Sequence, residues 1–236
     1  MKVLQNIQTL FIGITCLASM SIVACHDHPL DSNNNCTEIL VNPSFESITG
    51  TTPNPGHSGA LTGVEGWVKG PGAPQQNSPD IYDSPQEIPK NFMGNRTPLD
   101  GNNYAGISQG RHYGNYLNES LMGTLQSQLP EGEERTYRVS AWFSTGSVRR
   151  YPSDIEILLY NSQTREELQV VDARVSNSQN WEELSGSVDA NKAFDRLIIR
   201  GINKGENGHT LSYTYVDKVS VQECTSGCGD QNDDLR

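Results

Sequence analysis

Apolar and polar residues alternate over much of the chain after residue 36, in short runs separated by clusters of Gly, Pro, Asn and Asp. Alternation with a period of two is typical of half-buried β-strands. Helical periodicity is almost absent, and residues 190–195 favour one helical turn at most. The pattern predicts strands at residues 38–41, 66–69, 104–108, 119–128, 137–144, 155–160, 181–188, 196–202 and 212–223.

Many short strands without long helices between them predict an all-β fold, an antiparallel β-sandwich, rather than a parallel α/β sheet. Two long irregular stretches, residues 49–63 and 70–99, interrupt the strands and are rich in Pro, Gly, Asn and Ser. Loops of this length in a compact domain are often functional.

The predicted strand at residues 137–144 shows the alternation most clearly. Its apolar positions, Val139 to Phe143 at every second residue, are expected to enter the core, which places Arg138 and Trp142 on the opposite face. A Trp between polar neighbours on an open face suits stacking against a sugar ring. The alternative is a loop that covers Trp142, and the sequence leaves both open.

The densest apolar run lies at the N-terminus, at residues 10–24, behind Met1-Lys2. It is too short for a stable membrane span and is typical of a secretory signal. Its end, Ile22-Val23-Ala24-Cys25, resembles the bacterial lipobox, in which a diacylglycerol is attached to the Cys sulfur. We therefore expect a lipoprotein-type signal peptide at residues 1–24, a lipid anchor on Cys25 and a flexible tether at residues 25–35. An ordinary secretory signal is the alternative.

The charge balance limits the classes of partner that the protein is expected to bind. Lys+Arg 17 against Asp+Glu 28 gives a formal net charge of −11, which argues against nucleic-acid binding. A single long apolar run argues against several membrane spans. The hydrophobic share of 34% fits a sandwich whose strands turn alternate side chains to water.

The five cysteines suggest one disulfide. Cys16 leaves with the signal and Cys25 is acylated, so three remain for an oxidising compartment. Cys36 stands just before the first strand of the domain and Cys224 just after the last. If these strands are neighbours, Cys36–Cys224 links the ends of the fold; Cys224–Cys228 is the alternative.

Two motifs frame the domain. Asn42-Pro43-Ser44-Phe45-Glu46 follows the first strand, and Tyr215-Val216-Asp217-Lys218-Val219-Ser220-Val221 ends the last. Together with Gly66-Trp67 and residues 101–107, they resemble the galactose-binding-like jelly rolls of many carbohydrate-binding modules, and envelope proteins of Bacteroidetes-type bacteria. The resemblance implies a jelly-roll domain at residues 36–224, a polar tail at 225–236, and a place in the cell envelope at the outer membrane.

In that family the motif Glu and the closing Asp help to bind a structural calcium ion. Carried over to this chain, the candidate ligands are Glu46 and Asp217, whose hard oxygens suit Ca²⁺. The family usually has a second Asp where this chain has Lys218. The alternative to calcium is therefore an ion pair of Lys218 with Glu46 or Asp217.

Catalytic motifs are missing: the sequence has no nucleophile elbow, phosphate loop or zinc-binding helix, and we expect no organic cofactor. The carboxylate doublets at residues 133–134, 166–167 and 182–183 lie at expected strand ends or turns, where solvated surface is the simplest interpretation. A non-catalytic protein is therefore expected.

Carbohydrate binding requires an aromatic face with planar hydrogen-bonding groups around it. Residues 111–116 have the composition of a binding loop, or of a connector whose Tyr rings shield the sandwich edge. Trp67 and Trp181, at strand starts, are expected in the core. The candidate ligand-binding residues are Trp142, Arg138, Arg111, Tyr113, Tyr116 and Asp80.

These features predict a lipid-anchored envelope protein that binds a glycan without catalysis. The alternatives are an accessory lipoprotein that contacts a protein partner, and a hydrolase.

Overall fold

The computed structural model describes residues 36–49, 61, 63–71, 79–83, 94, 96–112, 115–127, 132–145, 153–176, 180–202 and 211–225, with the backbone alone at 111, 112 and 115–117. The predicted signal peptide and tether, with Cys25, lie outside these residues, as do Cys228 and all of the predicted tail except Thr225. No helix in the described part is long and apolar enough to cross a membrane.

The described residues form strands and connecting turns, without any helix. In chain order the strands are β1 (Cys36–Glu38), β2 (Trp67–Lys69), β3 (Asp80–Asp83), β4 (Asn103–His112), β5 (Asn115–Asn118), β6 (Ser120–Thr124), β7 (Arg135–Thr145), β8 (Ser153–Asn161), β9 (Glu166–Val175), β10 (Glu182–Ala190), β11 (Arg196–Ile202) and β12 (Ser212–Thr225).

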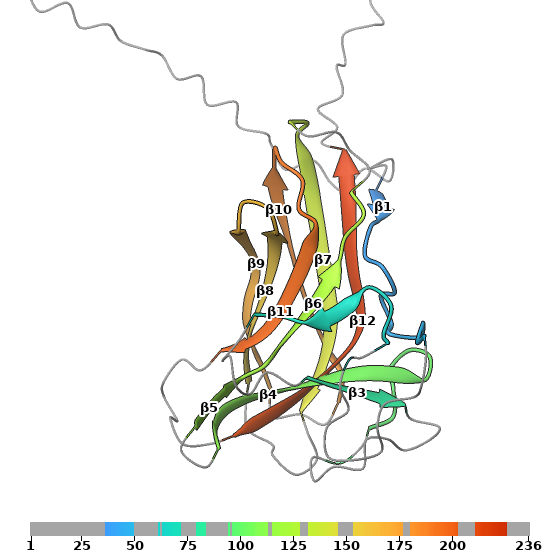
Figure 1. The fold of residues 1–236 in the computed structure, drawn as a ribbon, viewed down its shortest axis with the longest axis vertical. Coiled ribbons are helices and arrows are strands. Elements are labelled where there is room, and N and C mark those ends of the chain that lie inside the picture. Colours follow the sequence, from blue (N-terminus) through green and yellow to red (C-terminus); the bar gives the residue numbers. More distant parts are fainter. Residues whose placement is uncertain are drawn as a thin grey trace, which may run out of the picture. The chain divides into compact units, whose positions relative to one another are not determined.

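Two sheets face each other in the domain (Figure 1). The larger has the order β10-β7-β12-β4-β3, with β1 beside β12 and β5 beside β4. The smaller has the order β2-β6-β11-β8-β9. Every strand pair that the structure describes is antiparallel. The predicted antiparallel β-sandwich is confirmed.

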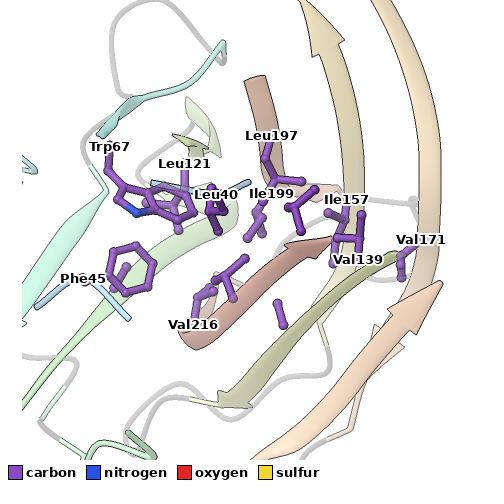
Figure 2. Packing of buried hydrophobic residues seen from close by; sticks show 14 of the residues in the cluster. Leu40, Phe45, Trp67, Leu121, Val139, Ile157, Val171, Leu197, Ile199 and Val216 are labelled. Carbon is purple, nitrogen blue, oxygen red and sulfur yellow. The ribbon is translucent and has the colours of Figure 1, made fainter. Parts of the chain in front are cut away.

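The core lies between the sheets and draws on both (Figure 2). From β7 it takes Val139 and Phe143, as the alternation predicted, and from β11 on the smaller sheet it takes Leu197 and Ile199. Each such side chain contributes roughly 1.5–3 kcal/mol of hydrophobic stabilisation when fully buried. The core therefore fixes which face of β7 points outward.

Trp67 belongs to the same core, as predicted. Its side chain is 2% exposed and its ring centroid lies 4.6 Å from that of Phe45. Its indole N–H donates to the backbone carbonyl of Asn42 at 2.8 Å. The Asn42–Glu46 motif thus turns the chain so that Phe45, at a positive φ of 62°, enters the core.

Strands β3, β5 and β9 were not predicted, and the helical turn at residues 190–195 is wrong. The irregular chain there places Phe194 in the core, where its backbone N–H donates to the Tyr137 hydroxyl at 3.3 Å. Burial of a Phe ring outweighs the weak preference of this short segment for a helix.

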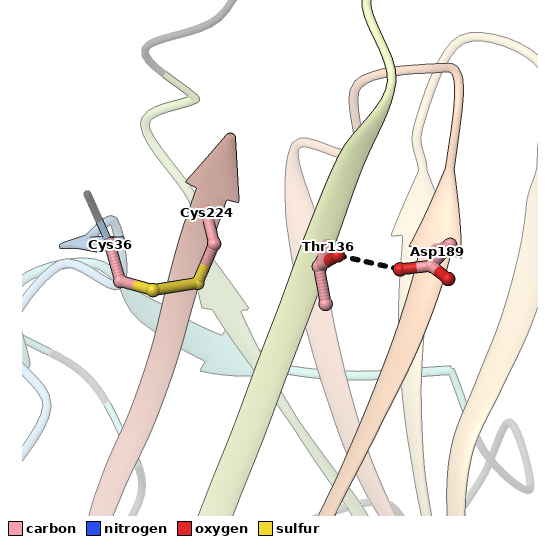
Figure 3. The surroundings of a disulfide bond; sticks show 4 residues. All are labelled: Cys36, Thr136, Asp189 and Cys224. Carbon is pink, nitrogen blue, oxygen red and sulfur yellow. Dashed lines mark hydrogen bonds between the residues drawn. A yellow bond between two sulfur atoms is a disulfide. The ribbon is translucent and has the colours of Figure 1, made fainter. Parts of the chain in front are cut away.

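The two ends of the domain meet at β1 and β12. Cys36 is the register partner of Cys224, and a disulfide joins them across 188 residues of sequence (Figure 3). The predicted Cys36–Cys224 pairing is confirmed. One residue before Cys224, the buried Glu223 carboxylate accepts a 2.9 Å hydrogen bond from Arg135 and forms a buried ion pair with it.

Strand β12 contains an irregularity opposite β7. Asp217 pairs with Trp142, whereas Ser220 pairs with Ser140, so β12 has one extra residue at this point. Lys218 lies in this β-bulge with a φ of 46°, and Val219 donates its N–H to the carbonyl of Pro43 at 3.0 Å. Bulges of this kind locally increase the twist of a strand.

Candidate functional site

Three rows of side chains cross the outward face of the larger sheet, from β10 over β7 to β12. Because Val139 and Phe143 enter the core, their neighbours on β7 point outward. The strand registers give the rows as Glu183–Trp142–Asp217, Ser185–Ser140–Ser220 and Ser187–Arg138–Gln222. Apart from the buried Asp217, we call these residues the platform.

Trp142 differs from the other two tryptophans of the chain. Trp67 and Trp181 donate their indole N–H groups to backbone carbonyls, those of Asn42 at 2.8 Å and Thr97 at 3.1 Å. The Trp142 indole forms no hydrogen bond with any residue that the structure describes. Its side chain is half-buried, so part of it is open to solvent.

Trp181, which was expected in the core, lies on the outward face instead. It is half-buried and packs edge-on against Tyr104, with ring centroids 6.2 Å apart. Its neighbours form a second apolar cluster, separate from the main core. This tyrosine cluster comprises Tyr82, Tyr104, Leu211, Tyr213 and Tyr215.

The tyrosine cluster is held by stacking and by a chain of hydroxyls. The rings of Tyr82 and Tyr104 stack with centroids 4.7 Å apart. The Tyr82 hydroxyl donates to that of Tyr213 at 2.9 Å, which in turn donates to Asp80 at 2.6 Å. Burial raises the pKa of Tyr213 well above its usual range, so its hydroxyl stays a donor. The predicted ligand residue Asp80 is thus buried within this cluster.

The segment from Gly94 to Asp100, as far as it is described, covers the tyrosine cluster. Tyr215 donates its hydroxyl to the Gly94 carbonyl at 2.7 Å, and the Arg96 N–H donates to the Tyr104 hydroxyl at 2.6 Å. The Arg96 guanidinium reaches Ser144 Oγ at 2.9 Å. These contacts already use polar groups of the tyrosine cluster, so they are not open to a ligand. The platform is therefore the more accessible half of the outward face.

The absence of a side chain at Gly106 makes room for Tyr213 in the tyrosine cluster. A Cβ at this position would lie 2.3 Å from the Tyr213 hydroxyl and 2.7 Å from its ring. The Tyr213 ring therefore crosses β4 directly above the backbone of Gly106 to reach Asp80 on β3. This contact explains one glycine of the motif at residues 101–107.

Glu46 and Asp217, the candidate calcium ligands, both bind the backbone of residues 99–103. Asp217 Oδ2 accepts from the N–H groups of Leu99 at 2.7 Å and Asp100 at 3.1 Å. Glu46 Oε1 accepts from those of residues 102 and 103, at 2.8 and 2.7 Å. Lys218 is exposed and forms no ion pair with either carboxylate.

These hydrogen bonds limit what a calcium ion could use. Glu46 Oε1 and Asp217 Oδ2 each already accept two N–H groups, and Asp217 Oδ1 accepts that of Lys218 at 2.7 Å. The described residues contain no group of three or more His, Cys, Asp or Glu side chains that could hold a metal. The side chains present do not complete a calcium shell, and calcium stays a prediction.

Asp217 is the buried member of this pair, with a side chain that is 0% exposed. Burial raises its pKa from 3.8 to about 6, although the three backbone hydrogen bonds favour the ionised form and oppose the rise. Its carboxylate is therefore charged at neutral pH.

The remaining predicted ligand residues lie elsewhere or outside the described part. Arg111 and Tyr116 are register partners on β4 and β5, where only the backbone is described, and Tyr113 is not described. Gln109 on β4 pairs with Ser212 at the start of β12, and Arg111 lies beyond it, whereas the platform residues of β12 are Ser220 and Gln222, so the structure does not bring these positions to the platform. Of the predicted set, Trp142 and Arg138 share one surface.

Three residues of the doublets at 166–167 and 182–183 have structural partners. Glu166 pairs with Lys192, Glu167 pairs with Arg200 at 3.2 Å, and Glu182 accepts the N–H of Ser176 at 2.5 Å. These contacts support the interpretation of the doublets as surface at strand ends.

No protein-family model matches the chain, and no curated protein matches it either. Several solved structures are similar in fold. A family 16 carbohydrate-binding module has a TM-score of 0.42 at 11% identity, over 78% of this chain and 98% of the module. The CBM22-1 xylan-binding domain from Paenibacillus barcinonensis has a TM-score of 0.44 at 12% identity, over 72% of this chain and 93% of the domain.

An arabinose-bound α-L-arabinofuranosidase is also similar, with a TM-score of 0.47 at 12% identity over 79% of this chain. The chain spans 26% of that enzyme. At these identities the likeness concerns the fold, and the ligands named are those of the other proteins.

Proposed function

We propose that this protein binds a carbohydrate, without catalysis, on the platform. The observation that carries the proposal is Trp142: its ring is half-buried on an outward sheet face, and its indole N–H lacks a partner among the described residues. A sugar ring offers an apolar C–H face to such an aromatic surface, and its hydroxyls need hydrogen-bonding groups nearby.

The rest of the platform supplies those groups. Ser140, Ser185 and Ser187 present hydroxyls within two residues of each other on β7 and β10, and Gln222 presents an amide on β12. These side chains stand on regular strands whose opposite faces are fixed in the core, so the platform is preorganised. Sites on rigid elements lose less entropy when they bind.

We also propose that the protein is attached to the bacterial cell envelope through a lipid on Cys25. The support is the lipobox-like sequence at residues 22–25. A lipid anchor would hold the sandwich at a membrane surface through the short segment before Cys36.

Calorimetric titration against a panel of soluble polysaccharides tests the binding proposal, with the Trp142→Ala and Trp142→Phe variants beside the wild type. We expect Trp142→Ala to weaken binding at least tenfold and Trp142→Phe to weaken it less, because a ring remains. Both variants should melt close to the wild type, since Trp142 lies outside the core. A wild type that binds no saccharide at millimolar concentration, or Trp142→Ala binding as tightly as wild type, overturns the proposal.

A further inference from the structure

Arg138 stands in the platform without a partner. Its side chain is half-buried, and it forms no hydrogen bond or ion pair with any described residue. Four other arginines of the described sandwich form ion pairs with carboxylates. These pairs are Arg135–Glu223, Arg174–Asp154, Arg196–Asp195 and Arg200–Glu156.

The side chains beside Arg138 are neutral. Its cross-strand partners are Ser187 on β10 and Gln222 on β12, and its outward neighbours along β7 are Thr136 and Ser140. The chain is rich in acidic residues, 28 in all, yet neither register partner of Arg138 in the described sheet is acidic. Among the described strands, Arg138 thus has no ion-pair partner and neutral side chains directly beside it.

Two carboxylates near Arg138 in the strand register, Asp189 on β10 and Glu38 on β1 beyond β12, already accept hydrogen bonds. Asp189 accepts from Thr136 Oγ1 at 2.6 Å (Figure 3). Glu38 accepts from Ser220 Oγ at 2.6 Å and from the N–H groups of Leu40 and Val221 at 2.9 and 3.0 Å. Glu183 lies at the other end of the platform, opposite Trp142.

A guanidinium partly removed from water is most stable against a planar, bidentate anion. Arg138 and Trp142 are four residues apart on one strand, which separates them by roughly 13 Å. One end of the platform therefore offers an aromatic surface and the other an anion-binding group, within reach of different sugar units of one chain.

We propose that the ligand of the platform is an acidic glycan, and that Arg138 binds its carboxylate or sulfate group while another sugar unit stacks on Trp142. This inference rests on the proposed function and names its ligand class. The exposed Glu183 places a constraint on it: the anionic group must lie toward Arg138, away from the Trp142 end.

Calorimetric titration with three probes tests the proposal: an oligogalacturonate, its fully methyl-esterified form, and a sulfated neutral oligosaccharide. The variants are Arg138→Gln and Arg138→Lys. The matched control is Arg165→Gln, which removes the same charge from an exposed arginine in the turn between β8 and β9. We expect the wild type to bind at least one anionic probe ten or more times as tightly as the ester. A preference for the oligogalacturonate assigns the anion as carboxylate, and one for the sulfated probe assigns it as sulfate.

Arg138→Gln should abolish that preference, Arg138→Lys should retain part of it, and Arg165→Gln should bind like the wild type. Affinity for the anionic probe should also fall as salt is added. Equal affinity for the oligogalacturonate, the sulfated probe and the ester, or an equal loss in Arg165→Gln and Arg138→Gln, overturns the anionic ligand and leaves carbohydrate binding standing. Failure to bind any neutral or charged saccharide overturns both proposals.

Discussion

Glu46 and Asp217 hold opposite ends of one loop, residues 99–103, through backbone hydrogen bonds. Glu46 comes from the motif that opens the domain and Asp217 from the strand that closes it. The loop leads directly into β4, the strand that carries Tyr104. The two motifs therefore position the start of β4, and the segment over the tyrosine cluster, through this loop.

Asp217 makes stability depend on pH. Its folded-state pKa of about 6 exceeds its usual 3.8, so between these values the folded protein binds more protons than the unfolded chain. Its contribution to the free energy of unfolding therefore falls as pH rises through this window, by on the order of 3 kcal/mol. Urea unfolding of the wild type and of Asp217→Asn between pH 4 and 7 measures how the free energy of unfolding changes with pH. An identical pH slope in the variant would contradict the assignment to Asp217.

Calcium removal tests the predicted metal site. If Ca²⁺ binds at Glu46 and Asp217, the melting temperature should be lower in EDTA than in millimolar calcium, because a ligand of the folded state stabilises it by mass action. The Glu46→Gln variant should lose the difference. Equal melting temperatures in both buffers for the wild type would show that the hydrogen bonds to residues 99–103 suffice without the ion.

The Cys36–Cys224 disulfide closes nearly the whole domain into one loop of 188 residues. The chain-entropy model assigns a loop of this size about 5 kcal/mol, from the restricted unfolded state. We expect Cys36→Ser to lower the free energy of unfolding by several kcal/mol in urea. Peptide mapping without reduction provides the independent check: a Cys224–Cys228 peptide in place of Cys36–Cys224 would contradict the structure.

Gly106→Ala should destabilise the protein by roughly 1–3 kcal/mol, because the added methyl group meets the Tyr213 hydroxyl and ring. Thermal unfolding of the single variant measures the cost. The same substitution in a Tyr213→Ala background should cost less, since the clashing ring is absent. Equal costs in the two backgrounds would place the strain elsewhere.

Lipid attachment can be measured in a bacterial host with a fatty-acid label. The full chain should incorporate the label and sediment with membranes, whereas Cys25→Ala should do neither. Labelling that persists in Cys25→Ala would remove the proposed anchor.

The strands predicted best were those whose alternation is strong. On β7 the pattern correctly separated the core positions Val139 and Phe143 from Arg138 and Trp142. Strand β9 was not predicted because it lies at the edge of its sheet. Most of its side chains are at least partly exposed, and of its ten residues only Val171 and Val175 are buried. Edge strands carry weaker alternation, since packing constrains them less.

The candidate site was predictable only in part, because its limits depend on contacts between distant segments. Nothing local distinguishes Trp181, whose N–H meets the Thr97 carbonyl, from Trp142, whose N–H does not. Asp80 sits beside Tyr213 through a pairing of β3 with β4 that periodicity did not reveal. Which polar group stays open is decided by the tertiary fold.

The extra residue at Lys218 sets which side chains β12 shows to solvent. Before it, the odd-numbered Tyr213 and Asp217 point outward; after it, the even-numbered Ser220 and Gln222 do, while Val219 and Val221 enter the core. If β12 instead paired regularly through Lys218, without the bulge, the parity of the rest of the strand would be exchanged, with two valines on the platform and two polar groups inside. The chemistry of this surface thus depends on the bulge: deletion of Lys218 would leave Ser220 and Gln222 facing outward in a regular ladder, whereas a retained Lys218 requires the bulge to keep them there.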